Sequence, residues 1–178
     1  MINKNYIIET NAKFSDDNLK RYFLQKTWYT KEEYNNKNLF HPKTAVFILI
    51  NPSKDNGQES DQTIMTISNY ILDKGYNSLI ILNLFPYMAT KFKDIPIYER
   101  KIDTCNDTYI KEICKNNDFI ILACGTYTTG VRFSMRKHIL DIIEPYKEKV
   151  FCFSDSNNFG YHPRTIHSNW KLTKYPFK

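Results

Sequence analysis

The sequence predicts an α/β protein, a three-layer sandwich in which helices cover both faces of a central four-stranded parallel sheet. Two observations support this fold. Four short apolar runs rich in branched residues alternate with three segments of helical periodicity, as in a parallel sheet with right-handed crossovers. The chain of 178 residues also has an ordinary length for one hydrophobic core, so we expect a single domain spanning residues 1–178.

The predicted strands are continuous apolar runs, which are typical of strands buried on both faces. They cover residues 45–50 (AVFILI), 78–84 (SLIILNL), 118–124 (DFIILAC) and 149–153 (KVFCF). In the expected strand order 2-1-3-4, the direction of winding reverses between the first and third strands. A ligand site is therefore expected beyond the carboxyl ends of these two strands.

Three predicted helices connect the strands. The first is capped by Asp61 and ends before Gly75, the second covers residues 99–115, and the third covers residues 128–143 and stops before Pro145. Apolar residues at helical spacing should face inward: Ile64, Ile67, Ile71 and Leu72 in the first helix, Ile102, Cys105, Tyr109 and Ile113 in the second, and Val131, Met135, Ile139, Ile142 and Ile143 in the third.

The predicted core covers residues 44–172, and residues 1–43 form an amino-terminal extension. Within this extension, residues 19–29 (LKRYFLQKTWY) are compatible with an added strand or with a short helix. Residues 85–98 contain two prolines and predict a long ordered loop, a type of segment that often carries function.

Composition narrows the class of protein. The net charge of +6 favours a polyanionic partner such as DNA, although the surface composition of a low-GC genome explains the charge equally well. In the long loop, Lys91 and Lys93 are expected to contact phosphates. No apolar run reaches the roughly 20 residues of a membrane span, and the first residues lack a signal-peptide pattern. We therefore expect a cytoplasmic protein without a membrane partner. The oligomeric state stays open, with a monomer favoured.

The cysteines give no indication of a metal site. Cys105, Cys114, Cys124 and Cys152 show neither C-x-x-C spacing nor a nearby pair of histidines. We interpret all four as buried structural residues and expect no metal.

Polar residues follow the first predicted strand. Asn51 emerges from it with Pro52 and Ser53, and its side chain can hold a water through its carbonyl oxygen or bind a base or sugar edge with both groups. An Asx turn that closes the strand is the structural alternative. Asp55 and Asp61 in the same loop can activate a water, although Asp61 also suits a helix cap.

Two other strand ends carry candidates for substrate binding. Asn83 lies near the end of the second strand, close to Phe85, and can read a base edge or satisfy the backbone of a neighbouring loop. Gly125, Thr126 and Tyr127 form a small loop that leads into a helix, where free N–H groups favour a phosphate or another anion.

Histidine, arginine and tryptophan lie close together near the end of the chain. His162 precedes Pro163, which holds the histidine on a rigid turn, and Arg164 can pair with a phosphate. His167 and Trp170 suit a stacked base, although Trp170 can equally close the core.

These motifs resemble those of a family of short bacterial and phage proteins, the domain of unknown function family 1643. The resemblance covers most of the chain. It rests on four blocks: Arg21-Tyr22 to Trp28, Asn51-Pro52-Ser53 with Asp61-Gln62-Thr63-Ile64, Asn83-Leu84-Phe85 with Ala89-Thr90, and His162-Pro163-Arg164.

More distantly, the order of elements is similar to that of the uracil-DNA glycosylase superfamily, which has a parallel 2-1-3-4 sheet. Asn51-Pro52 is similar to the core of its water-positioning motif, with Leu49 and Ser53 in place of two glycines. The other similarities are Asn83 to a base-reading asparagine, Gly125 to a strand-end glycine, and His162-Pro163 to a late His-Pro motif in which Arg164 replaces a small residue.

The resemblance implies a DNA glycosylase-like hydrolase, with a role in repair, defence or nucleotide metabolism. A base, expected to be modified, is flipped from double-stranded DNA or taken from single-stranded DNA, and its N-glycosidic bond is hydrolysed. Asn51, with Asp55 or Asp61, orients the water, Asn83 reads the base, and His162 stabilises the departing base. This mechanism requires no organic cofactor. Two alternatives stay open: an enzyme that processes a free nucleotide, and a module that binds nucleic acid or a nucleotide without catalysis.

Overall fold

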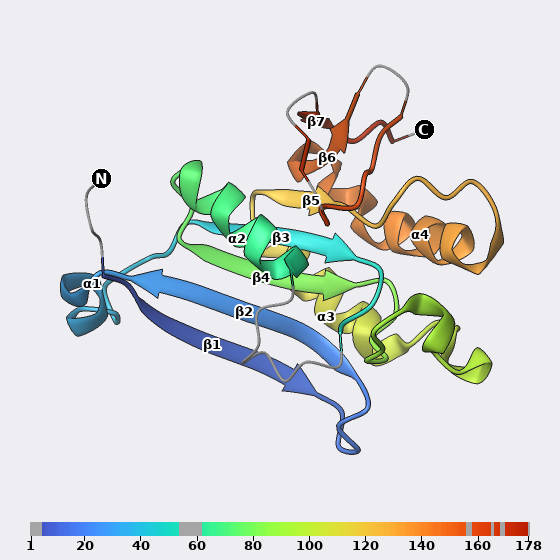
Figure 1. Ribbon diagram of the computed structural model, residues 1–178, viewed down its shortest axis with the longest axis horizontal. Coiled ribbons are helices and arrows are strands. Elements are labelled where there is room, and N and C mark those ends of the chain that lie inside the picture. Colours follow the sequence, from blue (N-terminus) through green and yellow to red (C-terminus); the bar gives the residue numbers. More distant parts are fainter. Residues whose placement is uncertain (1–4, 54–61, 156–157, 165, 168–169, 178) are drawn as a thin grey trace.

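The computed structural model describes residues 5–53, 62–155, 158–164, 166–167 and 170–177. Its centre is one seven-stranded sheet with the order β1-β2-β4-β3-β5-β6-β7 (Figure 1). The four predicted strands are β3 (Thr44–Leu49), β4 (Ser78–Asn83), β5 (Ile120–Leu122) and β6 (Val150–Ser154), which pair in parallel with one another. The α/β fold is thus confirmed, in a sheet larger than the predicted one.

Three antiparallel strands extend the sheet at its two edges. β1 (Ile7–Phe14) and β2 (Arg21–Tyr29) form a hairpin, and β2 pairs with β4. At the other edge, β7 (Lys171–Lys174) pairs with β6. The strand alternative for residues 19–29 is confirmed. Leu24 and Trp28 of β2 explain it, because their buried side chains fix one face of the strand against the core.

Helices cover both faces of the sheet and give three layers (Figure 1). α2 (Gln62–Asp73) lies on one face, where its buried isoleucines pack with the odd-numbered side chains of β3 and β4. α3 (Thr104–Lys115) and α4 (Gly130–Ile143) lie on the other face with the even-numbered side chains. This separation follows from the alternation of side chains along a strand.

The remaining helical segments are short. α1 (Lys31–Asn35) follows β2 and begins at a capping box formed by Thr30 and Glu33. The long loop after β4 contains the 3₁₀ turns η1 (Phe92–Asp94) and η2 (Ile97–Glu99), and η3 (Glu144–Lys149) follows α4. Within the described part of the chain, no helix is both long and apolar enough to cross a bilayer.

The inward face of α3 differs from the prediction by one residue. The buried residues are Asn106, Ile110 and Cys114, whereas Ile102 and Cys105 are exposed. A polar side chain explains the difference, because Nδ2 of Asn106 donates a hydrogen bond to the carbonyl oxygen of Asn83 at 3.0 Å. An amphipathic pattern assigns asparagine to the surface, so this buried contact could not be predicted from spacing.

Two further interpretations are corrected by the exposure of single side chains. Cys105 is exposed and is not a buried structural residue, whereas Cys114, Cys124 and Cys152 are buried as predicted. Burial raises the pKa of Cys114 and of Cys124 to about 12, so both remain thiols at neutral pH. Val131 is also exposed, because it lies in the first turn of α4, beyond the edge of the core.

Asp103 ties α3 to the β1–β2 hairpin. Its Oδ1 accepts the backbone N–H of Asn106 at 3.0 Å, which caps the helix, and its Oδ2 lies 2.9 Å from Nζ of Lys20. Asp103→Ala should lower the free energy of unfolding by about 1–2 kcal/mol, mainly through loss of the cap. Urea denaturation would measure this change, and Asp16→Ala, at an exposed position, is the matched control.

The same carboxyl should make stability depend on pH. Burial by itself raises the pKa of Asp103, but the N–H of Asn106 and the ammonium of Lys20 outweigh it and hold the pKa below its ordinary value. A pKa lower in the folded than in the unfolded state stabilises the protein at neutral pH, and this stabilisation is lost as the pH falls through the folded pKa. The difference in stability between wild type and Asp103→Ala should therefore shrink below about pH 4. An undiminished difference at pH 2 would contradict the electrostatic explanation.

Candidate functional site

A cavity of about 630 Å³ lies beyond the carboxyl ends of β3, β4 and β5. Its volume is within the usual range of small-molecule sites, roughly 300–1,000 Å³. The described residues that line it are Leu49, Ile50, Asn51, Ser53, Gln62, Thr63, Ala89, Thr90, Lys91, Phe92, Tyr127, Arg132, His162 and Arg164. We call this cavity the candidate site. It lies where the strand order predicted a ligand site.

Asn51 is held in one orientation at the wall of the candidate site. Its Nδ2 donates hydrogen bonds to the carbonyl oxygens of Ala89 at 2.6 Å and of Pro52 at 3.1 Å. Ala89 in turn donates its backbone N–H to the oxygen of Pro52 at 2.9 Å. Both amide hydrogens of Asn51 are therefore engaged, whereas its Oδ1 accepts no hydrogen bond from the described residues. Only the carbonyl oxygen of this side chain is available to a water or substrate.

A stacked arginine forms another part of the wall. The guanidinium of Arg132, in the first turn of α4, lies 3.6 Å from the ring centre of Tyr127 and 4.9 Å from that of Phe92. Cation–π contacts with two rings restrict this side chain without neutralising its charge. A planar guanidinium held in this way is suited to binding a phosphate or carboxylate through two hydrogen bonds.

The loop that carries Tyr127 depends on a glycine and on a second arginine. Gly125 has φ +94°, and a Cβ atom at this position would lie 2.9 Å from the Tyr127 ring. From α4, Arg136 donates Nη1 to the carbonyl oxygen of Gly125 at 3.0 Å and Nη2 to that of Tyr127 at 2.8 Å. The tight approach of the ring to the backbone is thus possible only at glycine.

The segment after β6 reaches the site through the same glycine. Gly125 donates its N–H to the carbonyl oxygen of Gly160 at 2.8 Å, and Gly160 donates to that of Phe153 at 2.8 Å. These bonds bring the following His162 and Arg164 to the wall of the candidate site. Pro163 between them is buried, which anchors the turn as expected for a His-Pro segment.

The candidate site is positively charged. Among its described lining residues, Lys91, Arg132 and Arg164 are cationic and none is acidic. The cations come from three separate segments, so the charge is a property of the assembled site rather than of one motif. The predicted catalytic carboxylates Asp55 and Asp61 lie outside the described residues.

The structure thus brings together six of the predicted site residues, Asn51, Ser53, Lys91, Tyr127, His162 and Arg164. Pro52 and Gly125 are buried and shape the wall through their backbone. Lys93, Thr126 and His167 are exposed and do not line the site. Trp170 stacks on Tyr161 with ring centres 4.5 Å apart and contacts Phe153, which favours the core-closing alternative.

Two predicted residues lie behind the lining. Phe85 is fully buried, and its ring centre lies 5.2 Å from that of Phe92, which does line the site. Asn83 is 1% exposed, opposite the lining residue Leu49 in the parallel register. Neither Oδ1 nor Nδ2 of Asn83 finds a hydrogen-bond partner among the described residues. An unpartnered buried amide lowers the stability of the folded protein, and a functional role is one explanation for keeping it.

Eight of the described lining residues were not among the predicted site residues: Leu49, Ile50, Gln62, Thr63, Ala89, Thr90, Phe92 and Arg132. Gln62, Thr63 and Arg132 lie in the first turns of α2 and α4, the helices that follow β3 and β5. The first turn of a crossover helix lies beside the carboxyl end of the strand before it. Residues in these first turns could therefore have been predicted to line the site. Phe92 had no comparable signal, because its place depends on the course of a long loop.

Gly125 and Gly75 form a matched pair for testing the tight loop. Gly75 also has a positive φ of 75°, but a Cβ there would meet no atom within 4 Å. Gly75→Ala should cost about 1–2 kcal/mol from the backbone alone. Gly125→Ala should cost about 1–3 kcal/mol more, because the Tyr127 ring must move. Urea denaturation of both variants would measure the difference, and equal costs would contradict this account of the loop.

A substitution of Asn83 should not destabilise the protein, in contrast to Gly125→Ala. Asn83→Leu removes two unpartnered polar atoms at similar volume and should leave the free energy of unfolding unchanged or raise it by about 1 kcal/mol. Asn106→Leu, also at a buried position, removes one Oδ1 without a partner among the described residues but loses the bond to the Asn83 carbonyl, and it should destabilise by about 1 kcal/mol. Thermal or urea unfolding distinguishes the two. A large destabilisation by Asn83→Leu would show that the amide is satisfied in the folded protein.

Comparisons with known proteins identify only the family of this chain. The chain matches no curated protein and no solved structure. The profile of the family described as "Protein of unknown function (DUF1643)" matches residues 21–164, which includes β2, the whole parallel sheet and the His162-Pro163-Arg164 turn. The chain therefore belongs to the DUF1643 family.

Proposed function

We propose that this protein hydrolyses the N-glycosidic bond of a nucleotide, and that its substrate is a base, modified rather than plain uracil, flipped out of DNA. The observation that carries this proposal is the orientation of Asn51. Among the described residues, its carbonyl oxygen has no hydrogen-bond partner, its amide nitrogen is fixed by two hydrogen bonds, and the described lining of the cavity includes three cations. Such an oxygen can hold a water in place, and the cations suit the phosphates on either side of a nucleotide.

The proposed reaction breaks the bond between C1′ of the sugar and the base nitrogen, and the base leaves with the electron pair. The sugar then has oxocarbenium character, and the oxygen of a water bonds to C1′ while the water loses a proton. This proton ends on the departing base, so the products are the neutral base and an abasic sugar with a hydroxyl at C1′. Asn51 accepts a hydrogen bond from this water and aims it at C1′. In this reaction His162, which lines the same cavity, stabilises the negative charge that develops on the departing base.

The arrangement of the sheet supports this proposal. β4, β3, β5 and β6 are adjacent and parallel, and in the order of the chain they are the second, first, third and fourth of the predicted strands. This is the order that the resemblance to the uracil-DNA glycosylase superfamily implies. The Asn51-Pro52 and His162-Pro163 segments, which carry that resemblance, both reach the candidate site.

The loop between the site and α3 favours a partner larger than a free nucleotide. Ile97 and Tyr98 are 82% and 70% exposed, in the same loop that supplies Lys91 and Phe92 to the site. Arg100 holds this loop through hydrogen bonds to the carbonyl oxygens of Ile95 at 3.0 Å and Lys93 at 2.8 Å. Large apolar side chains on a firm loop beside cations suit contact with stacked bases.

A binding module without catalysis is the second candidate. The observation that favours it is that Asn51 has a structural role. Its hydrogen bonds to Pro52 and Ala89 hold two loops together whether or not a reaction occurs. Such a module would keep the cationic site and bind a nucleotide without releasing its base.

The test is a panel of duplex and single-stranded DNAs containing uracil, other lesions or hypermodified bases, assayed for abasic sites by alkaline cleavage. Wild type should release at least one base. Asn51→Ala should slow the release by about 10²–10³-fold while the Kd for the same DNA changes little, because the residue positions water rather than phosphate. Asn11→Ala, at an exposed position of β1, is the matched control.

Thermal unfolding of Asn51→Ala separates chemistry from folding. A variant that keeps its Tm and its Kd but loses base release supports the proposal. Full base release by Asn51→Ala would remove this residue from the mechanism. If wild type releases no base from any DNA but binds a mononucleotide, the second candidate or a nucleotide-processing enzyme replaces the proposal.

A further inference from the structure

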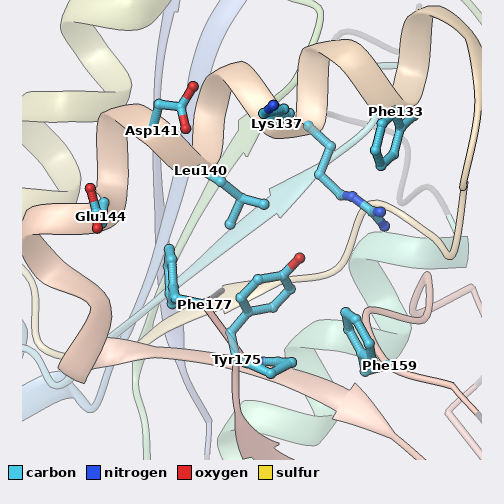
Figure 2. Close-up of a pocket in the computed structure, with 10 residues that line it drawn as sticks. Phe133, Lys137, Leu140, Asp141, Glu144, Phe159, Tyr175 and Phe177 are labelled. Atoms are coloured by element: carbon cyan, nitrogen blue, oxygen red, sulfur yellow. The ribbon is translucent and has the colours of Figure 1, made fainter.

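A second cavity, of about 410 Å³, lies between α4 and the segment that follows β7 (Figure 2). Aromatic rings from three parts of the chain line it: Phe133 of α4, Phe159 after β6, and Tyr175 and Phe177 after β7. Leu140 of α4 points into it from above the ring of Tyr175 (Figure 2). We call this cavity the α4 groove.

Polar side chains line the groove in two places. Lys137, Asp141 and Glu144 line it along α4 and the turn that follows, and Arg136 and Tyr175 form a separate polar end. The Tyr175 hydroxyl points toward α4 (Figure 2) and has no hydrogen-bond partner among the described residues. Burial raises the pKa of Tyr175 although the nearby Arg136 lowers it in part, so the hydroxyl keeps its proton at neutral pH and can donate. Arg136 also lines the groove, and it retains N–H groups beyond the two that bind Gly125 and Tyr127.

We propose that the α4 groove is a second ligand site, for a small aromatic molecule with a carboxylate or similar acidic group, and that its occupancy is coupled to the candidate site through Arg136. The rings would stack on the aromatic body in edge or offset geometry. The acidic group would lie at the end formed by Arg136 and the Tyr175 hydroxyl, where its charge and its oxygens find donors. A cavity of this volume accommodates one such molecule.

The coupling follows from two sets of hydrogen bonds. Arg136 lies between the cavities, because the same guanidinium that faces the groove holds the carbonyl oxygens of Gly125 and Tyr127. Phe159 of the groove precedes Gly160, whose carbonyl oxygen accepts the N–H of Gly125 at 2.8 Å. A ligand that fixes Arg136 and Phe159 therefore fixes the loop that presents Tyr127, and with it the Arg132 guanidinium, to the candidate site.

Benzoate is the probe for the binding step. Saturation-transfer NMR on the full chain should show saturable binding to wild type. Leu140→Trp should weaken this binding by about tenfold or more, because the larger side chain fills the groove. Ser134→Trp places the same side chain on an exposed position of α4 outside the groove and should leave binding unchanged. Absence of saturable binding, or equal binding by wild type and Leu140→Trp, would overturn the proposal.

Amide hydrogen exchange measures the coupling without reference to any substrate of the candidate site. Saturating benzoate should slow exchange at residues 125–127 of wild type by about fivefold, the lower end of ordinary coupling between sites. Arg136→Met should bind benzoate more weakly and lose this protection even at saturation. If wild type shows no protection, or if protection persists in Arg136→Met, the coupling through Arg136 is refuted. These outcomes are independent of whether the candidate site hydrolyses a glycosidic bond.

Discussion

The hydrogen bonds that join the loop after β3 to the loop after β4 are the constraint on which the candidate site depends. The parallel pairing does not stop with the strands, because Leu84 donates to the oxygen of Leu49 and Phe85 to that of Ile50, each at 2.9 Å. Ala89 then completes the ladder with Pro52 and with the Asn51 side chain. A side chain fixed by both its backbone and its amide is positioned before any ligand arrives, which is the requirement for directing a water.

Arg132 in the candidate site and Arg136 beside it are held by groups that do not neutralise their charge. Lys20, on the outer hairpin, is paired with both Glu99 and Asp103 and contributes little net field. Arg132, in contrast, is held by aromatic rings, and Arg136 by backbone carbonyls. Rings and carbonyls restrict a guanidinium without adding a full negative charge, so the positive potential remains available to a phosphate.

The parts of the fold that follow from local pattern could be predicted from the sequence. β3, β4, β5 and β6 are continuous apolar runs, and their common direction is enough to bring Asn51, Tyr127 and His162 to one cavity. Positions set by tertiary contacts could not be predicted. Asn106 faces inward because of one bond to the Asn83 carbonyl, and Phe92 contacts Arg132 because the long loop after β4 carries its ring to the site. Neither contact can be read from the spacing of apolar and polar residues in the sequence.

The two sides of the candidate site differ in the number of hydrogen bonds that hold them. The side with fewer hydrogen bonds is the one that we expect to move when a ligand binds. On the β3–β4 side, four hydrogen bonds join neighbouring loops over a short distance. On the β5–β6 side, the loop at Gly125 has a glycine's freedom and is held by one guanidinium and one bond to Gly160. A loop restrained by few contacts is the part whose equilibrium a ligand can shift. Asn51 is therefore the firmly held side of the candidate site, and Tyr127 with Arg132 forms the side that can adjust.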